Sequence, residues 1–292
     1  MRHLRLTTTL TSVSLFLAVP AQGVFAEDPV GRISLGINLG ASYLTMGDVN
    51  DEVNRGNRDL FSEPNWKPME DLALGFSFRA DLKAAVKDPF FISLGRGNIR
   101  GHTGVAFNRV IDVDASTTVY YGRLLWAIPW RPMENGRFFL GGGPLILRDM
   151  ELEVAHEWDL IPKRPERRET LVMNGSGSGF QLDLAAEYLL SDHMTISLDT
   201  GYRWAKGDLD AWLLTVDNWE TRPGQDPEPD NQQLFWESYL VGAFIADPGT
   251  RPADNSQRNF DGPPLDVVEP VQGLGLDFSG ARIEVGFRIH FF

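Results

Sequence analysis

The feature that most constrains the fold of this chain is a two-residue alternation of apolar and polar side chains, clearest from residue 279 to residue 292. Two is the side-chain period of a β-strand, because successive side chains point to opposite faces. One face of this segment carries Ile283, Val285, Phe287, Ile289 and Phe291, and the other carries Arg282, Glu284, Arg288 and His290. A strand with lipid on one side and a polar lumen on the other needs this pattern. The segment therefore predicts a strand of a transmembrane barrel.

Four further stretches, at 33–43, 72–83, 180–188 and 194–204, show the same alternation. An amphipathic helix would instead need apolar residues spaced by three and four. Weaker patterns at about 101–114, 117–131 and 137–157 bring the predicted strands to eight, and single-chain bacterial barrels have even strand numbers. The sequence thus predicts an all-β fold, an antiparallel up-and-down barrel of eight strands. Apolar stretches at 90–99 and 234–245 leave ten strands as an alternative, and a soluble β-sandwich is a second one.

The predicted connections are of two kinds. Short turns are expected at 87–89, 133–136 and 191–193, and long polar loops at 47–70, 159–178 and 206–278. If the first strand begins in the periplasm, every short turn lies on the periplasmic side and every long loop lies outside the cell. Short inner turns with long outer loops are typical of outer-membrane barrels.

Residues 1–26 have the composition of a secretory signal peptide. Arg2 and Arg5 precede an apolar run of about ten residues, and small residues up to Ala26 suit a cleavage site. That run is too short for a helix across a bilayer about 30 Å thick. We therefore expect export, followed by a single barrel domain at 27–292. The chain has no cysteine, which excludes disulfides, thiolate metal sites and cysteine nucleophiles.

The polar faces of the predicted strands define a charged lumen. Its expected members are Arg79, Asp81, Lys83, Asp183, Glu187, Asp199, Arg203, Arg282, Glu284 and Arg288, joined by Glu151 and Glu153. Opposite charges in a narrow, poorly solvated space should pair, because an unpaired buried charge is costly. Pairing favours a closed lumen, whereas the alternative interpretation of the same charges is an ion-selective constriction.

Aromatic side chains should mark the two membrane interfaces, where amphipathic rings prefer to lie. On the predicted topology Tyr43, Tyr202 and Trp204 approach the outer rim. Trp130, Tyr188 and Phe291 approach the inner rim.

The predicted barrel is compatible with several classes of function. The main expectation is a structural, loop-presenting or weakly conducting barrel, and the alternatives are a selective channel or adhesion through the acidic 206–278 loop. A lipid-modifying enzyme would need a Ser beside a His, and none of the four histidines after the signal has a Ser two residues on. We expect no enzyme activity, no cofactor and no metal. The net charge of −13 argues against a nucleic-acid partner.

The signal peptide, the 31–46 strand, LLSDHMTISLDTGYRW and LDFSGARIEVGFRIHFF together resemble small Gram-negative outer-membrane barrels of the OmpA-like or OmpW-like type. The resemblance implies a cell outer-membrane location, contact with membrane lipid and lipopolysaccharide, and recognition of the last strand by the barrel-assembly machinery. In that family signal a final Phe continues the lipid-facing row, but here Phe291 does so and Phe292 is out of phase. Such barrels are functionally diverse, so no single activity is implied. A narrow closed barrel should be stable as a monomer.

Overall fold

The structure is a computed structural model that describes residues 33–60, 68–106, 109–129, 133, 135–158, 167–216, 219–221 and 275–291. The predicted signal peptide, Trp130, the 234–245 segment and Phe292 lie outside these residues. The elements are β1 (Ile33–Tyr43), α1 (Gly47–Leu60), β2 (Leu74–Lys87), β3 (Phe90–Ala106), β4 (Arg109–Ile128), β5 (Gly136–Trp158), β6 (Arg167–Ser191), β7 (Met194–Val216), β8 (Trp219–Thr221), β9 (Gly275–Asp277) and β10 (Gly280–Phe291). In the described part of the chain, no helix is long and apolar enough to cross a membrane.

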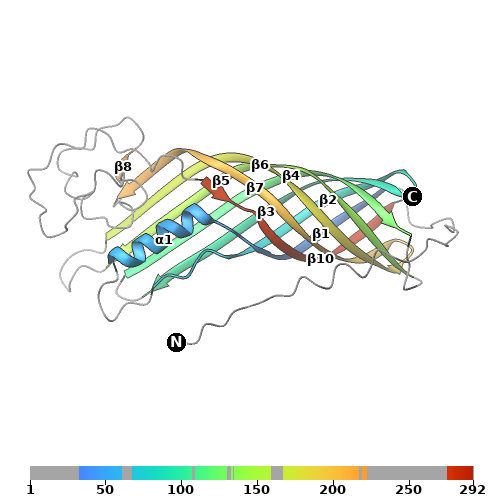
Figure 1. The fold of residues 1–292 in the computed structure, drawn as a ribbon, viewed down its shortest axis with the longest axis horizontal. Coiled ribbons are helices and arrows are strands. Elements are labelled where there is room, and N and C mark those ends of the chain that lie inside the picture. The colour runs from blue at the N-terminus through green and yellow to red at the C-terminus, as the bar shows by residue number, and fades with distance from the viewer. Residues whose placement is uncertain are drawn as a thin grey trace, which may run out of the picture.

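Eight antiparallel strands close into a ring (Figure 1). Each strand from β1 to β7 pairs with the next one along the chain, and β10 closes the ring between β7 and β1. The short strands β8 and β9 pair only with β7 and lie outside the ring. The predicted eight-stranded barrel is therefore confirmed.

The strands are staggered by ten residues around this ring. A path perpendicular to the strands leads from Ile37 through Phe287 of β10 to Ile196 of β7. The path from Ile37 in the opposite direction runs through β2, β3, β4, β5 and β6 and reaches β7 at Lys206. The two paths therefore meet β7 at positions that differ by 206 − 196 = 10 residues, which is the stagger of the barrel. A stagger of this kind requires the strands to tilt, typically by about 35–45° from the barrel axis.

The connections at one end of the barrel are all short, and the other end carries the longer connections together with the two-residue link between β3 and β4. The turns at 88–89 and 192–193 and the connection at 129–135 define what we call the turn end. Residues 44–73 and the far ends of β4 to β7 define the opposite loop end. All three predicted short turns therefore lie together at the turn end. β10 also finishes there, so the C-terminus lies beside these turns in Figure 1.

The strands differ greatly in length, and the longer ones continue past the ring at the loop end. β6 has 25 residues, whereas β1 has 11 and β10 has 12. β3 to β7 therefore form a curved open sheet there, and α1 lies along it (Figure 1). Val49 and Val53 of the helix are one turn apart on one face, and both are fully buried. They pack with buried strand residues such as Leu147, Leu152 and Leu171.

The segment that follows the helix is held to it by asparagine side chains. Asn57 accepts a hydrogen bond from the Met69 amide at 2.9 Å and donates one to the Met69 carbonyl at 3.0 Å. Asn50 accepts from the Leu72 amide at 2.7 Å. The helix and residues 69–72 thus form a single covering layer over the open sheet. The predicted 47–70 loop is therefore partly an ordered helix.

An ion pair outside the membrane-spanning segments joins β9 to the extension of β7. Lys206 Nζ lies 2.8 Å from Asp277 Oδ2. Burial acts to raise the pKa of the Asp277 carboxyl, but hydrogen bonds from Lys206 and Ser279 outweigh it, so this pKa is lowered. Hydrogen bonding to Asp277 raises the pKa of Lys206. Because a carboxyl with a lowered pKa stabilises the fold in its ionised form, the pair contributes at neutral pH and its contribution is lost as the pH falls through that pKa.

Three sequence predictions of strand boundaries differ from the structure. The predicted 101–114 strand is wrong, because residues 90–106 form β3 and residues 109–128 form β4. Residues 167–178, predicted as part of a loop, belong to β6, and residues 206–216 belong to β7. The stretch at 175–179 resembles a linker because alternate glycines leave no side chains to show a face. A Cβ on Gly177 would lie 2.3 Å from the Lys206 carbonyl oxygen. The two strands can therefore approach this closely only because residue 177 has no side chain.

A β-bulge in β5 exchanges the two faces of that strand. The register with β6 shifts between Leu147 and Met150, and Asp149 has a positive φ of 49°. An extra residue in one strand turns every later side chain to the other face. Met150 and Leu152 therefore point inward and are fully buried. Glu151 and Glu153, predicted for the lumen, lie on the outer face instead.

The junction between β9 and β10 gives a test of the fold. Gly280 has a φ of +151°, and a Cβ there would lie 1.8 Å from the Tyr43 carbonyl oxygen. We expect Gly280→Ala to lower the temperature at which the folded barrel is lost in SDS, because a strained backbone costs about 1–3 kcal/mol before the clash is counted.

The control for this substitution is Gly47→Ala, since a Cβ on Gly47 meets nothing within 4 Å. It should leave the melting temperature in SDS unchanged or slightly higher. Equal stability of both variants, read from gel mobility with and without heating, would contradict the close approach of β1 and β10.

Candidate functional site in the barrel lumen

The interior of the ring carries the charged residues that the sequence analysis assigns to it. All ten are buried, with 1–6% of their surface exposed: Arg79, Asp81, Lys83, Asp183, Glu187, Asp199, Arg203, Arg282, Glu284 and Arg288. They come from β2, β6, β7 and β10, whose alternate residues face inward. The outward neighbours on the same strands are apolar and about half exposed, as Phe287 at 56% and Leu198 at 42% show.

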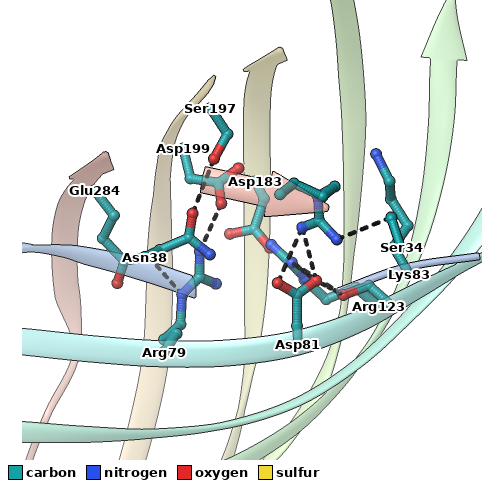
Figure 2. Close-up of polar contacts among 12 residues, drawn as sticks. Ser34, Asn38, Arg79, Asp81, Lys83, Arg123, Asp183, Ser197, Asp199 and Glu284 are labelled. Carbon is teal, nitrogen blue, oxygen red and sulfur yellow. Dashed lines mark hydrogen bonds and ion pairs between the residues drawn. The ribbon is translucent and has the colours of Figure 1, made fainter. Parts of the chain in front are cut away.

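Asp81 is the centre of the first of two groups of ion pairs. It accepts from Arg288 Nη2 at 2.9 Å, from Arg123 Nη2 at 3.3 Å and from the Ser93 hydroxyl at 2.6 Å. Figure 2 shows Asp81 with Arg123 beside it. Arg288 also reaches Glu187, with 3.1 Å between Nε and Oε1. Each carboxylate thus has more than one donor, as a buried anion requires.

Lys83 completes the same group toward the turn end. Its ammonium donates to both oxygens of Glu187, at 2.6 and 2.7 Å. It also lies 4.1 Å from the centre of the Phe139 ring, a distance at which a cation is attracted to the ring face. Carboxylate and aromatic ring together replace the water that the ammonium loses on burial.

A second group lies around Glu284. Arg282 Nη1 donates to it at 2.7 Å, the Ser77 hydroxyl donates at 2.9 Å, and Arg79 forms an ion pair with it. Arg79 also donates to Asp199 at 2.8 Å, and Figure 2 shows Arg79 between these two carboxylates. The planar guanidinium suits such sharing, because its five donors form a rigid fork.

Asp183 joins the two groups. It pairs with Arg282 and, through Oδ2 at 3.3 Å, with Arg123 Nη1. Arg123 therefore bridges Asp81 and Asp183 from β4.

Arg123 is a central member of the site that the sequence analysis missed. In β4 the inward face also carries Val119, Tyr121 and Leu125, so no run of polar residues marks it. The signal that identifies Arg123 is its position in the two-residue alternation. Tyr120 and Leu124 are exposed on the outer face, so Arg123 belongs to the inward face. The guanidinium lies 5.0 Å from the Tyr121 ring centre, which adds a cation–π contact.

Buried apolar side chains lie in the lumen on both sides of the charged layer. Toward the turn end, Leu125, Phe139 and Ala185 form a buried cluster with Phe91 packed against it. Phe91 and Phe139 meet edge to face, with ring centres 5.4 Å apart. Toward the loop end, a larger cluster begins at Ile99, Val119, Leu145 and Phe278 and continues under α1. An eight-stranded barrel has just enough room for side chains to fill it, and here they do.

The outer face bears an apolar band that is tall enough to span the hydrocarbon core of a bilayer. Along β6 the exposed residues run from Leu190 through Leu184 to Phe180, and then change to Ser178 and Ser176. That apolar run matches the about 9–11 residues that a tilted strand needs to cross a bilayer. This exterior, combined with a closed ring, is that of a transmembrane barrel.

Of the six predicted interface aromatics, the five that the structure describes lie toward the two borders of this band, and Trp130 lies outside the described residues. Tyr43, Tyr202 and Trp204 lie on the outer face toward the loop end, and each is 40–56% exposed. Tyr188 and Phe291 lie toward the turn end at 42% and 48% exposed. Tyr202 and Trp204 contact each other, with ring centres 4.7 Å apart.

Two of the predicted histidines have contacts that the structure shows. His290 is buried, and its Nε2 lies 3.1 Å from the Thr195 hydroxyl. His102 is exposed on the outer face beside Asp114, 3.3 Å away. Among the described residues there is no group of three or more metal-ligating side chains placed to hold an ion.

A scan against protein-family models gives no match for this chain, and a comparison with curated proteins gives none either. Among solved structures, the chain is similar to one described as "Crystal Structure of Acinetobacter baumannii CarO". The identity is 10%, the TM-score is 0.34, and the alignment covers 73% of this chain and 92% of that one. The closed strand pairing of this chain, and not that likeness, establishes the barrel.

The ion-pair network gives a second test. We expect Asp183→Asn to destabilise the barrel by about 3 kcal/mol, since removing one partner of a buried ion pair leaves the other charge uncompensated. Denaturant unfolding of the barrel in detergent micelles measures this change.

The matched control is Asp114→Asn, which breaks the exposed pair with Arg100 at 3.1 Å. Exposed pairs contribute about 0–1 kcal/mol, so this variant should unfold almost as the parent does. Equal losses of unfolding free energy in both variants would contradict the central role of Asp183.

Proposed function

We propose that this protein is an outer-membrane barrel with a closed lumen, which holds a folded structure at the cell surface and does not pass solutes. The observation that carries the proposal is the filled interior. A charged layer lies between two buried apolar clusters, and every carboxylate in it has at least one cationic donor, with two for each of them except Asp199. An ion crossing the barrel would have to break buried ion pairs and enter apolar regions, and both steps are costly.

The apolar band and the aromatic borders support placement in a bilayer, and the position of the longest connections at one end of the barrel supports the outer membrane. In this orientation the turn end faces the periplasm. The predicted signal peptide agrees with export. Outer-membrane lipid and lipopolysaccharide are then the surroundings of the barrel, and the barrel-assembly machinery is the partner of β10.

The part proposed for the cell surface is the open sheet of β3 to β7 with α1 packed on it. Its interior is a conventional apolar core, with Met46, Leu72 and Leu147 fully buried. On β6 the outward side chains beyond Phe180 are Ser178, Ser176 and Asn174, which suit water and not lipid. This region therefore has the composition of a soluble structure built on membrane strands. We propose a structural or presenting role without enzyme activity or a cofactor.

Conductance tests the closed lumen. Purified barrel in planar bilayers should give no stable single-channel steps, while a trimeric porin prepared in the same way does. Intact, SDS-resistant barrel recovered from the bilayer preparation shows that the protein is folded. Large, stable steps from this preparation would overturn the closed-lumen proposal and favour the solute-channel alternative.

The absence of cysteine from the chain allows a clean test of orientation. We expect Asp51→Cys, on the exposed side of α1, to react with a membrane-impermeant maleimide on intact cells. Asp192→Cys, in an exposed turn at the turn end, should react only after the outer membrane is permeabilised. Labelling of both positions only after lysis would contradict surface display, and the reverse pattern would invert the topology.

A further inference from the structure

The lumen contains one more buried cation than buried carboxylates in the part of the chain that the structure describes. The cations are Arg79, Lys83, Arg123, Arg203, Arg282 and Arg288, and the carboxylates are Asp81, Asp183, Glu187, Asp199 and Glu284. A net positive charge in a poorly solvated interior is unfavourable unless an anion accompanies it. His290 is buried as well, and it offers no negative charge.

Arg203 is the cation without a carboxylate. Its side chain is buried, with 3% of the residue exposed, and its Nε donates to the Phe278 carbonyl oxygen at 2.8 Å. Among the described residues no carboxylate lies within ion-pair distance of Arg203, whereas each of the other five lumen cations has at least one. Its Nη2 is buried and has no acceptor.

Arg203 lines a small void at the loop end of the charged layer. The void measures about 10 Å³, which is room for about one water molecule or a monatomic ion. The residues around it contribute buried donors that have no hydrogen-bond acceptor: Arg203 Nη2, Arg79 Nη1, Arg282 Nε, Gln181 Nε2 and the Tyr121 hydroxyl. Figure 2 shows two of the lining residues, Arg79 and Glu284, close together.

The lining offers many donors and few free acceptors. Glu284 is the carboxylate in the lining, and its oxygens already accept from Ser77 and Arg282 and pair with Arg79. A water molecule accepts about two hydrogen bonds and needs acceptors for its own hydrogens. An occupant that only accepts, and that carries one negative charge, satisfies both the excess donors and the excess charge.

We propose that this void is a binding site for one small monovalent anion of the halide class, held by Arg203, Arg79, Arg282, Gln181 and Tyr121. Chloride has the required charge and size. Sulfate and phosphate are too large for the space. They also carry more negative charge than the single charge needed to balance the extra buried cation. The anion is a structural ligand that completes the ion-pair network, and Arg203 is its principal counter-charge.

Bromide provides the direct test, because its anomalous scattering identifies it in a crystal. The mature barrel is refolded and crystallised in bromide, since a closed lumen limits exchange after folding. We expect an anomalous peak in the void of the parent protein and loss of that peak in Arg203→Gln. The matched control Arg148→Gln changes an exposed outer arginine and should keep the peak.

Stability gives an independent readout. For a ligand that binds only the folded state, a tenfold rise in concentration above its dissociation constant raises the folded-to-unfolded ratio about tenfold. Chloride is varied while sulfate is added to keep the ionic strength constant. We expect the stability of the parent and of Arg148→Gln to rise with chloride concentration, and the stability of Arg203→Gln to be independent of it. No bromide peak in the parent, together with equal stability in chloride and sulfate, would show that the void holds water only. A peak that persists in Arg203→Gln would overturn the role of that residue.

Discussion

Pairing of β10 with both β1 and β7 is the interaction on which the rest of this structure depends. Inside a bilayer there is no water to satisfy backbone amides and carbonyls, so a sheet can cross only if it has no free edge. Ten residues of β10 are in register with each neighbour, from Ile33–Phe291 to Ser42–Arg282 on one side and from Gly280–Arg203 to Ile289–Met194 on the other. Without this closure β1 and β7 would each expose an unpaired edge to lipid.

Closure with eight strands also determines what the interior can contain. The ring is narrow enough for side chains to meet across it, so the inward charges have to form pairs with one another. Arginine suits this demand better than lysine, because one guanidinium can hold two carboxylates from different strands. Arg123 does so between Asp81 and Asp183, and Arg79 does so between Asp199 and Glu284. The network thereby ties β2, β4, β6, β7 and β10 together through the centre of the barrel.

The sequence was sufficient for the barrel and for most of its lumen because the two-residue period is visible wherever both faces carry side chains. It failed where that period is hidden or broken. The glycines around Ser176 and Ser178 conceal a strand, and the bulge beside Asp149 turns Glu151 and Glu153 outward. Arg123 escaped notice because its inward neighbours are apolar. The helix α1 depends on a surface that exists only after β4 to β7 have curved around it, so its sequence alone gave little indication.

The unequal strand lengths have a consequence for how the molecule sits among its neighbours. A barrel whose strands all end at one level looks similar from every side within the membrane plane. Here the wall formed by β3 to β7 extends well beyond the shorter β1 and β10, and α1 packs against it. The protein therefore has a front and a back when viewed along the barrel axis from the loop end. Two molecules approaching in the membrane would meet back to back, front to front or front to back, and each arrangement would bring different surfaces together above the lipid.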